Sequence, residues 1–249
     1  MTRHHYDVAV AGVHRAERRL ADAGFPDVIG LDDCDLSASA FDEATHFWDL
    51  PTCRVRIVIT DQIRCGRENV APYLGVAVHG APNYFMVTGT GGAADAQLDY
   101  IVRCLELMWS TGSTRIEVLF STQRLAAMRS QARSVTADKP DPTAFDLSSH
   151  TGVADGIYDG PARIRVGDDD HRVRVRLSGR LDPIDGRYHW QGTVFEANGV
   201  CVGPAALMID ERTADCRITE RTSQGGFSVV GIGAPPYSLS DVDIVVPSR

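Results

Sequence analysis

The sequence contains almost no lysine: Lys139 is the single lysine among 25 basic residues, and arginine supplies the rest. Schiff-base chemistry and the phosphate-binding loop of P-loop proteins both require a lysine side chain. Lys139 lies in the polar stretch "DKPDPT", which is typical of a linker rather than of a binding loop. The composition therefore argues against both chemistries.

Paired cysteines and long apolar runs are also missing. The six cysteines include no CxxC motif and no pair at metal-ligand spacing, so we expect reduced thiols and no metal site. No apolar run reaches the roughly 20 residues that a membrane span requires, and no apolar signal segment precedes the cysteines. The formal net charge of −8 argues against an interface with nucleic acid. We therefore expect a cytoplasmic protein with no nucleic-acid partner and no membrane span.

The first part of the chain alternates between strand and helix patterns. Residues 6–11 form a short apolar run, residues 13–23 place apolar side chains at helical spacing, and "DVIGLDD" follows as a second apolar run. This order is typical of a parallel α/β unit. Further expected elements are strands at 53–60, 83–89 and 114–121, a short helix within 37–50, a long helix through 96–109 and a last helix at 123–132.

The pattern changes after a polar stretch at residues 136–156. From residue 157 onward, apolar and polar residues alternate around a Gly-Asp turn, as they do in β-hairpins. The sequence thus predicts an α/β + β protein. It comprises a shortened Rossmann-like domain with a parallel sheet at residues 1–135, a linker at 136–156, and a small antiparallel β barrel or sandwich at 157–249.

The first strand-to-helix turn keeps part of a dinucleotide-binding motif. In the pattern G-x-G-x-x-G, the glycines allow a tight bend and a close approach to the pyrophosphate. Gly12 fills the first position, but His14 and Glu17 stand where the other glycines belong. The helix N-terminus with Arg15 remains an anion site in principle, and Asp32 stands where a ribose-binding acid would lie. The alternative is a purely structural unit with a solvated basic helix face.

A second stretch, "APYLGVAVHGAPNYFMVTGTGG", carries a family resemblance. It is similar to the C-terminal part of the flavin-dependent monooxygenases of the Baeyer–Villiger and cyclohexanone-monooxygenase type, where such a run leads into a Gly-rich turn beside the flavin. Together with the opening α/β unit, the first 125 residues resemble the FAD-binding half of such an enzyme with its middle removed. The matching residues are Tyr73, Gly75, Val76, Gly80, Pro82, Asn83, Phe85 and Gly89.

The sequence lacks two motifs of this family, the glycine-rich turn that binds NADPH and the F-x-G-x-x-x-H signature. The resemblance therefore implies a non-catalytic, monooxygenase-like protein that acts in binding or assembly. We expect a homo-oligomer, because removal of the middle domain leaves apolar surface to be buried; a full-length monooxygenase is another candidate partner. No cofactor is expected, and the alternative is FAD or FMN held in a shifted pose. The cofactor-binding candidates are Gly12, His14, Arg15, Asp32, Gly89, Thr90 and Gly91.

The β domain resembles a domain of unknown function that follows some monooxygenase-like proteins, and this resemblance implies no activity. Around the turn at residues 183–186, an acid and an imidazole lie close in sequence. A pocket lined by these residues would make the β domain a binder of a small apolar ligand. The alternative is that Trp190 is a core residue and His189 an ordinary strand residue. The pocket candidates are Asp182, Asp185, His189 and Trp190.

Overall fold

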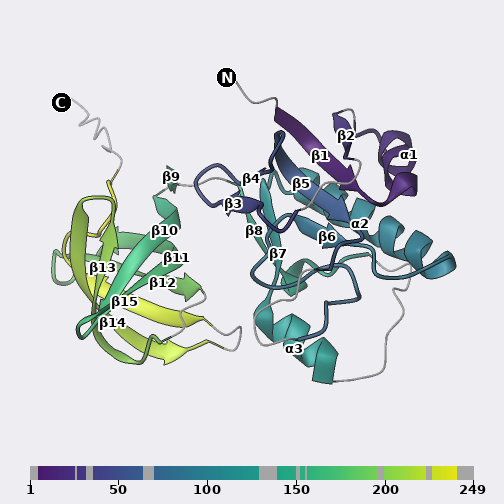
Figure 1. Cartoon of the computed structure of the whole chain (residues 1–249). Helices are drawn as coiled ribbons and strands as arrows, with labels where there is room; N and C mark the ends of the chain where they lie inside the picture. The colour runs from purple at the N-terminus through teal and green to yellow at the C-terminus, as the bar shows by residue number, and fades with distance from the viewer. Residues whose placement is uncertain are drawn as a thin grey trace, which may run out of the picture. The chain divides into compact units, whose positions relative to one another are not determined.

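The computed structural model divides into two compact units, Met1–Ser149 and His150–Arg249 (Figure 1). It describes residues 5–25, 27–31, 36–63, 70–128, 139–149, 152–154, 156–195, 199–222 and 226–239. The first unit mixes helices and strands, whereas the second is built from strands. This agrees with the expected α/β + β class. No helix in these ranges is both long and apolar enough to cross a membrane.

The first unit contains a six-stranded mixed sheet with a parallel centre. Strands β2, β1, β5 and β6 are neighbours in this order and all run parallel. The antiparallel pair β3 and β4 extends the sheet by pairing with the beginning of β5. The sheet is therefore mixed, whereas the sequence predicted a parallel sheet. The strands are β1 (His5–Ala11), β2 (Val28–Leu31), β3 (Ala40–Asp42), β4 (Phe47–Asp49), β5 (Arg54–Thr60) and β6 (Tyr84–Met86).

The prediction of a short helix within residues 37–50 is wrong, because this segment forms the β3–β4 hairpin. Phe41 and Trp48 are directly opposite each other, with ring centroids 5.3 Å apart. The Asp42 carboxylate accepts hydrogen bonds from the Ala44 amide at 2.9 Å and the Thr45 hydroxyl at 2.7 Å, which closes the turn. Cross-strand aromatic contact and turn chemistry thus outweigh the local helical spacing.

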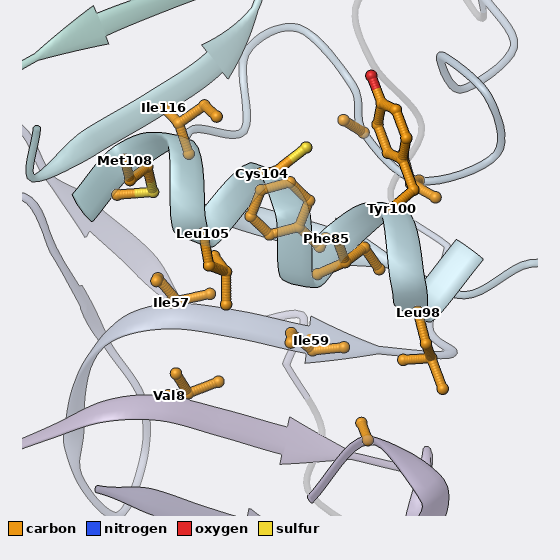
Figure 2. Packing of buried hydrophobic residues seen from close by; sticks show 14 of the residues in the cluster. Val8, Ile57, Ile59, Phe85, Leu98, Tyr100, Cys104, Leu105, Met108 and Ile116 are labelled. Carbon is orange, nitrogen blue, oxygen red and sulfur yellow. The ribbon is translucent and has the colours of Figure 1, made fainter. Parts of the chain in front are cut away.

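Two helices, α1 (His14–Asp22) and α2 (Gly92–Ser110), pack on the sheet. Figure 2 shows Leu98 and Leu105 of α2 pointing toward the side of the helix where β5 lies, the strand that carries Ile57 and Ile59. Tyr100 and Cys104 lie on the opposite side of the same helix and are also buried. Burial raises the pKa of the Cys104 thiol well above its usual value. Because both sides of α2 are covered, this helix is the centre of the first core.

The predicted linker at residues 136–156 contains ordered structure of both units. Strand β8 (Phe145–Ser148) pairs with β7 (Arg115–Val118) of the first unit. The short strand β9 (Gly152–Ala154) pairs with the barrel instead. Phe145 is buried in the first core, which explains why a polar-looking segment is ordered. Helix α3 (Phe120–Met128) and the 3-10 helix η2 (Pro142–Ala144) complete the first unit.

The second unit is a closed, six-stranded antiparallel barrel, which decides between the barrel and the sandwich. Its order is β11-β12-β15-β14-β13-β10, and β10 closes the ring by pairing with β11. Side chains such as Trp190, Val175 and Leu207 fill the interior and are almost fully buried. The strands are β10 (Ile157–Val166), β11 (Asp169–Leu181), β12 (Tyr188–Phe195), β13 (Gly203–Ile209), β14 (Arg212–Arg221) and β15 (Phe227–Ile232).

Candidate ligand sites

The carboxyl edge of the parallel strands holds most of the predicted cofactor residues. Gly12 follows β1 with φ = 73°, and α1 begins at His14, which is exposed. The turn at residues 89–91 follows β6 and leads into α2. Strands β1 and β6 are both parallel to β5, so the two turns lie at the same edge. Asp32 lies outside the described residues.

An acidic residue that the sequence analysis did not single out lies against Gly12. A Cβ atom added to Gly12 would meet Oδ1 of Asp61 at 2.2 Å, so the carboxylate fills the space beside this glycine. Asp61 directly follows β5, and its amide donates to the Ala11 carbonyl at 3.3 Å. Nothing in the local sequence marks this position, because its place beside Gly12 depends on the pairing of β5 with β1. The edge thus carries a negative charge where the glycine turn begins.

The basic residues of α1 are paired with carboxylates of α2. Nη1 of Arg15 lies 3.4 Å from Oδ2 of Asp95, and Arg19 pairs with both Asp95 and Asp99. These pairs are partly exposed, so each stabilises the fold only slightly. They nevertheless place a carboxylate beside Arg15, the cation that was a candidate for an anion site. Glu17, at the third glycine position, places its carboxylate beside Gly30 of β2.

The glycine-rich turn before α2 is held by the buried side chain of Gln97. Its Oε1 accepts the amide of Gly89 at 2.8 Å, and its Nε2 donates to the Leu74 carbonyl at 3.3 Å. Gly91 adopts φ = 56° and ψ = −130°, a conformation that is essentially restricted to glycine. Thr90 and Gly91 are exposed, with open space beside Gly91. The turn is therefore rigid at its base and accessible at its tip.

In the second unit, a groove with a volume of about 520 Å³ lies on β11, β12 and β15. Arg180, His189 and Ile232 are register partners across the three strands, and Ser178, Gln191 and Val230 form the next such row. The row between them is Gly179, Trp190 and Gly231, and the Trp190 side chain is buried. Successive residues of a strand point to opposite faces. The two outer rows therefore form the walls of the groove, and the backbone of the middle row is its floor.

The predicted acid–imidazole pair lies at one end of this groove. Nε2 of His189 and Oδ2 of Asp185 are 2.7 Å apart, and Oδ1 of Asp185 accepts the Arg187 amide at 2.9 Å. The Arg187 amide and the His189 imidazole together hold the pKa of Asp185 below its usual value. Oδ1 of Asp182 accepts the Ile184 amide at 2.8 Å. Three of the four pocket candidates, Asp182, His189 and Trp190, are among the residues that line the groove, and Asp185 is not.

Asp182, Asp185 and His189 also have the composition of a metal site. One possible ligand atom from each lies within 4.8 Å of the others. Both carboxylates, however, accept amides of their own turn, and Asp185 also contacts the imidazole. These contacts account for the cluster without an ion. We assign no metal to it.

A buried charge cluster in the first unit has a structural role. Arg115 is 3% exposed, and its guanidinium contacts the carboxylates of Glu43, Glu117 and Asp146 at 3.3 Å or less. Burial alone would lower the pKa of Arg115, but Glu117, Glu43 and Asp146 raise it, so the guanidinium stays charged. Oε1 of Glu117 also accepts the amide of Gly80 at 2.6 Å. The cluster ties the hairpin turn to β7 and β8.

Comparison with known proteins relates the chain to proteins without an assigned function. A family model described as a domain of unknown function (DUF4873) matches residues 155–239, the segment that contains the barrel strands. Uncharacterized proteins from Mycobacterium bovis and Mycobacterium tuberculosis are 47% identical over 179 residues, which make up 70% of this chain and 51% of theirs. The chain thus spans about half the length of the curated relatives it matches. No solved structure is significantly similar.

Proposed function

We propose that this chain is a non-catalytic relative of the flavin-dependent monooxygenases that acts through binding or assembly. The observation that carries the proposal is the Asp61 carboxylate beside Gly12. In dinucleotide-binding folds, the backbone at this turn lies close to the pyrophosphate. A carboxylate there repels a diphosphate, and the nearby Arg15 is already paired with Asp95. The usual cofactor pose is therefore opposed by charge.

The sequence supports the same proposal, because it lacks a site for the cofactor that would reduce a flavin. It has no second glycine-rich turn for a nicotinamide cofactor. A flavin in this protein would thus have no site for the hydride donor that the resembling enzymes use. Binding without turnover is the function that fits both the turn and this gap.

The alternative is a flavin carrier that holds FAD or FMN in a shifted pose. The exposed turn at Thr90 and Gly91 favours it, because backbone amides at the start of a helix attract anions. Storage of a small apolar ligand inside the barrel is less well supported. The interior is filled by buried side chains, among them Trp190 and Val194, so the groove is the better place for a ligand.

Titration of the full chain with FAD and FMN, followed by flavin fluorescence, tests the proposal. We expect no binding of either flavin at micromolar concentration. Asp61→Asn removes the charge at nearly constant volume and is expected to admit weak FAD binding, whereas Asp215→Asn on the barrel should not. A purified protein that is yellow, or that binds a flavin stoichiometrically, would overturn the proposal in favour of the carrier.

A further inference from the structure

The groove on β11, β12 and β15 presents charges of both signs that have no ionic partner. Arg180 forms no ion pair with any residue in the described ranges. The Asp182 carboxylate accepts only the Ile184 amide within those ranges. Both residues line the groove, and both are at the end of β11. The groove therefore has an unpaired cation and an unpaired anion near one end.

Apolar surface continues the groove away from these charges. Val230 is 37% exposed and Ile232 is 51% exposed, although both belong to a strand whose alternate residues fill the barrel core. Ile232 lies in the same row as Arg180 and His189. A ligand whose charged groups bind at this end would thus contact the aliphatic side chains of Val230 and Ile232 with its apolar part.

A buried donor without a partner lies beneath the floor of the groove, on the core side of the sheet. Nε1 of Trp190 forms no hydrogen bond within the described part of the chain, although the side chain is 1% exposed. A Cβ atom on Gly231, the register partner of Trp190, would point to the same core face and meet the six-membered ring at 2.1 Å, so the ring packs directly on the backbone of this glycine. Indole N–H is a donor only, and a buried unpaired donor costs stability. The indole therefore faces the core and not the groove, but it packs on the backbone of the groove floor, so its N–H signal reports a change there.

We propose that this groove binds a small zwitterion of the amino-acid type, with a carboxylate, an ammonium group and an apolar side chain. The Arg180 guanidinium receives the carboxylate, and the Asp182 carboxylate receives the ammonium group. Val230 and Ile232 contact the apolar side chain. His189, oriented by Asp185, adds a polar contact at the charged end. A volume of about 520 Å³ is within the usual range for small-molecule sites, roughly 300–1,000 Å³.

The experiment uses the indole N–H signals of the full chain in ¹H–¹⁵N NMR spectra. The chain has three tryptophans, so Trp190 is assigned once Trp48→Phe and Trp109→Phe have removed the other two signals. The probe is L-phenylalanine, and its matched fragments are 3-phenylpropionate, which lacks the ammonium group, and phenethylamine, which lacks the carboxylate. We expect millimolar L-phenylalanine to shift the Trp190 signal and leave the Trp48 and Trp109 signals in place. Each fragment should bind at least about tenfold more weakly, since one charged hydrogen-bonded contact is lost.

Two substitutions locate the contacts, and a third serves as the control. Arg180→Gln and Asp182→Asn should each weaken binding by about tenfold or more, and Asn can still accept the Ile184 amide, so the turn is kept. Arg212→Gln, on β14 outside the groove, should bind as the unchanged chain does. Failure of all three probes to shift the Trp190 signal would overturn the proposal. Equal binding of L-phenylalanine and 3-phenylpropionate would also overturn it, because Asp182 would then have no role.

This inference goes beyond the proposed function and fails separately from it. The flavin titration reports on the carboxyl edge of the first unit, whereas the Trp190 signal reports on the barrel. Flavin binding together with a phenylalanine-induced shift would overturn the proposed function and support ligand binding in the groove. No flavin binding and no shift would support the proposed function and overturn ligand binding in the groove.

Discussion

Asn83 joins three segments of the first unit through its side chain. Its Nδ2 donates to the carbonyls of His46 at 3.3 Å and Thr114 at 2.9 Å, and its Oδ1 accepts the amide of Ile116 at 2.8 Å. The residue is fully buried and has φ = 56°, where asparagine is tolerated better than other residues with a Cβ. This geometry explains why asparagine follows the proline in the stretch "GAPNYF".

We predict that Asn83→Ala lowers the free energy of unfolding of the first unit by about 3 kcal/mol or more. It removes three hydrogen bonds and leaves alanine in the left-handed region. Asn83→Gly loses the same bonds but tolerates the positive φ, so it should be less destabilising by about 1 kcal/mol. Urea unfolding monitored by circular dichroism measures both. Equal losses for the two variants would show that backbone conformation contributes nothing at this position.

The sequence singled out individual residues where a recognisable motif surrounds them. It did not single out residues that lie outside such motifs. The resemblance pointed to Asn83, and the turn between two strands pointed to Asp185 and His189. Asp61 and Gln97 carry no local pattern, because their positions beside Gly12 and Gly89 depend on how strands distant in sequence pair.

At the scale of elements, glycines set how closely the barrel strands approach. A Cβ atom on Gly192 of β12 would lie 1.9 Å from the carbonyl oxygen of Arg176 on β11, a backbone atom that cannot move aside alone. Gly92 at the start of α2 is the opposite case, because a Cβ atom there meets nothing within 4 Å and its φ is not positive. The two positions make a matched pair for one substitution.

We predict that Gly192→Ala destabilises the barrel by about 2–3 kcal/mol or prevents its closure, because overpacking forces the strands apart. Gly92→Ala should leave stability unchanged or raise it by up to about 1 kcal/mol, since alanine is the better helix former. Thermal unfolding of the full chain followed by near-ultraviolet circular dichroism compares them. A Gly192→Ala variant as stable as the unchanged chain would mean that β11 and β12 tolerate a wider spacing.

Elements with strong periodicity were predicted well, and the exceptions have tertiary causes. The alternating strands of the second unit and the long helix α2 follow their sequence patterns. The β3–β4 hairpin and β8 do not, because each is stabilised by partners elsewhere: β4 by β5, and β8 by β7. Local sequence could not show those pairings, since the hydrogen bonds join segments that are distant along the chain.

At the scale of the whole molecule, both units expose large apolar side chains. In the first unit Trp109 is 57% exposed and Met128 is 65% exposed, and in the second Leu181 is 65% and Ile184 is 94% exposed. Single exposed apolar residues are normal on protein surfaces. Leu181 and Ile184, however, lie within four residues of each other, at the end of β11 and in the turn that follows it. Such a concentration favours a contact with another protein surface.

We predict that the chain associates into a homo-oligomer at micromolar concentration, as measured by sedimentation equilibrium. If the hairpin end of the barrel is the contact, Leu181→Ser combined with Ile184→Ser should weaken association by about tenfold or more, because the buried apolar area of two side chains is lost. Trp109→Ser tests the first unit in the same way, although its stacking on Phe25 at 4.4 Å must be lost as well. A strictly monomeric unchanged chain would contradict the prediction. It would also leave binding of a different partner or a small ligand as the role of these surfaces.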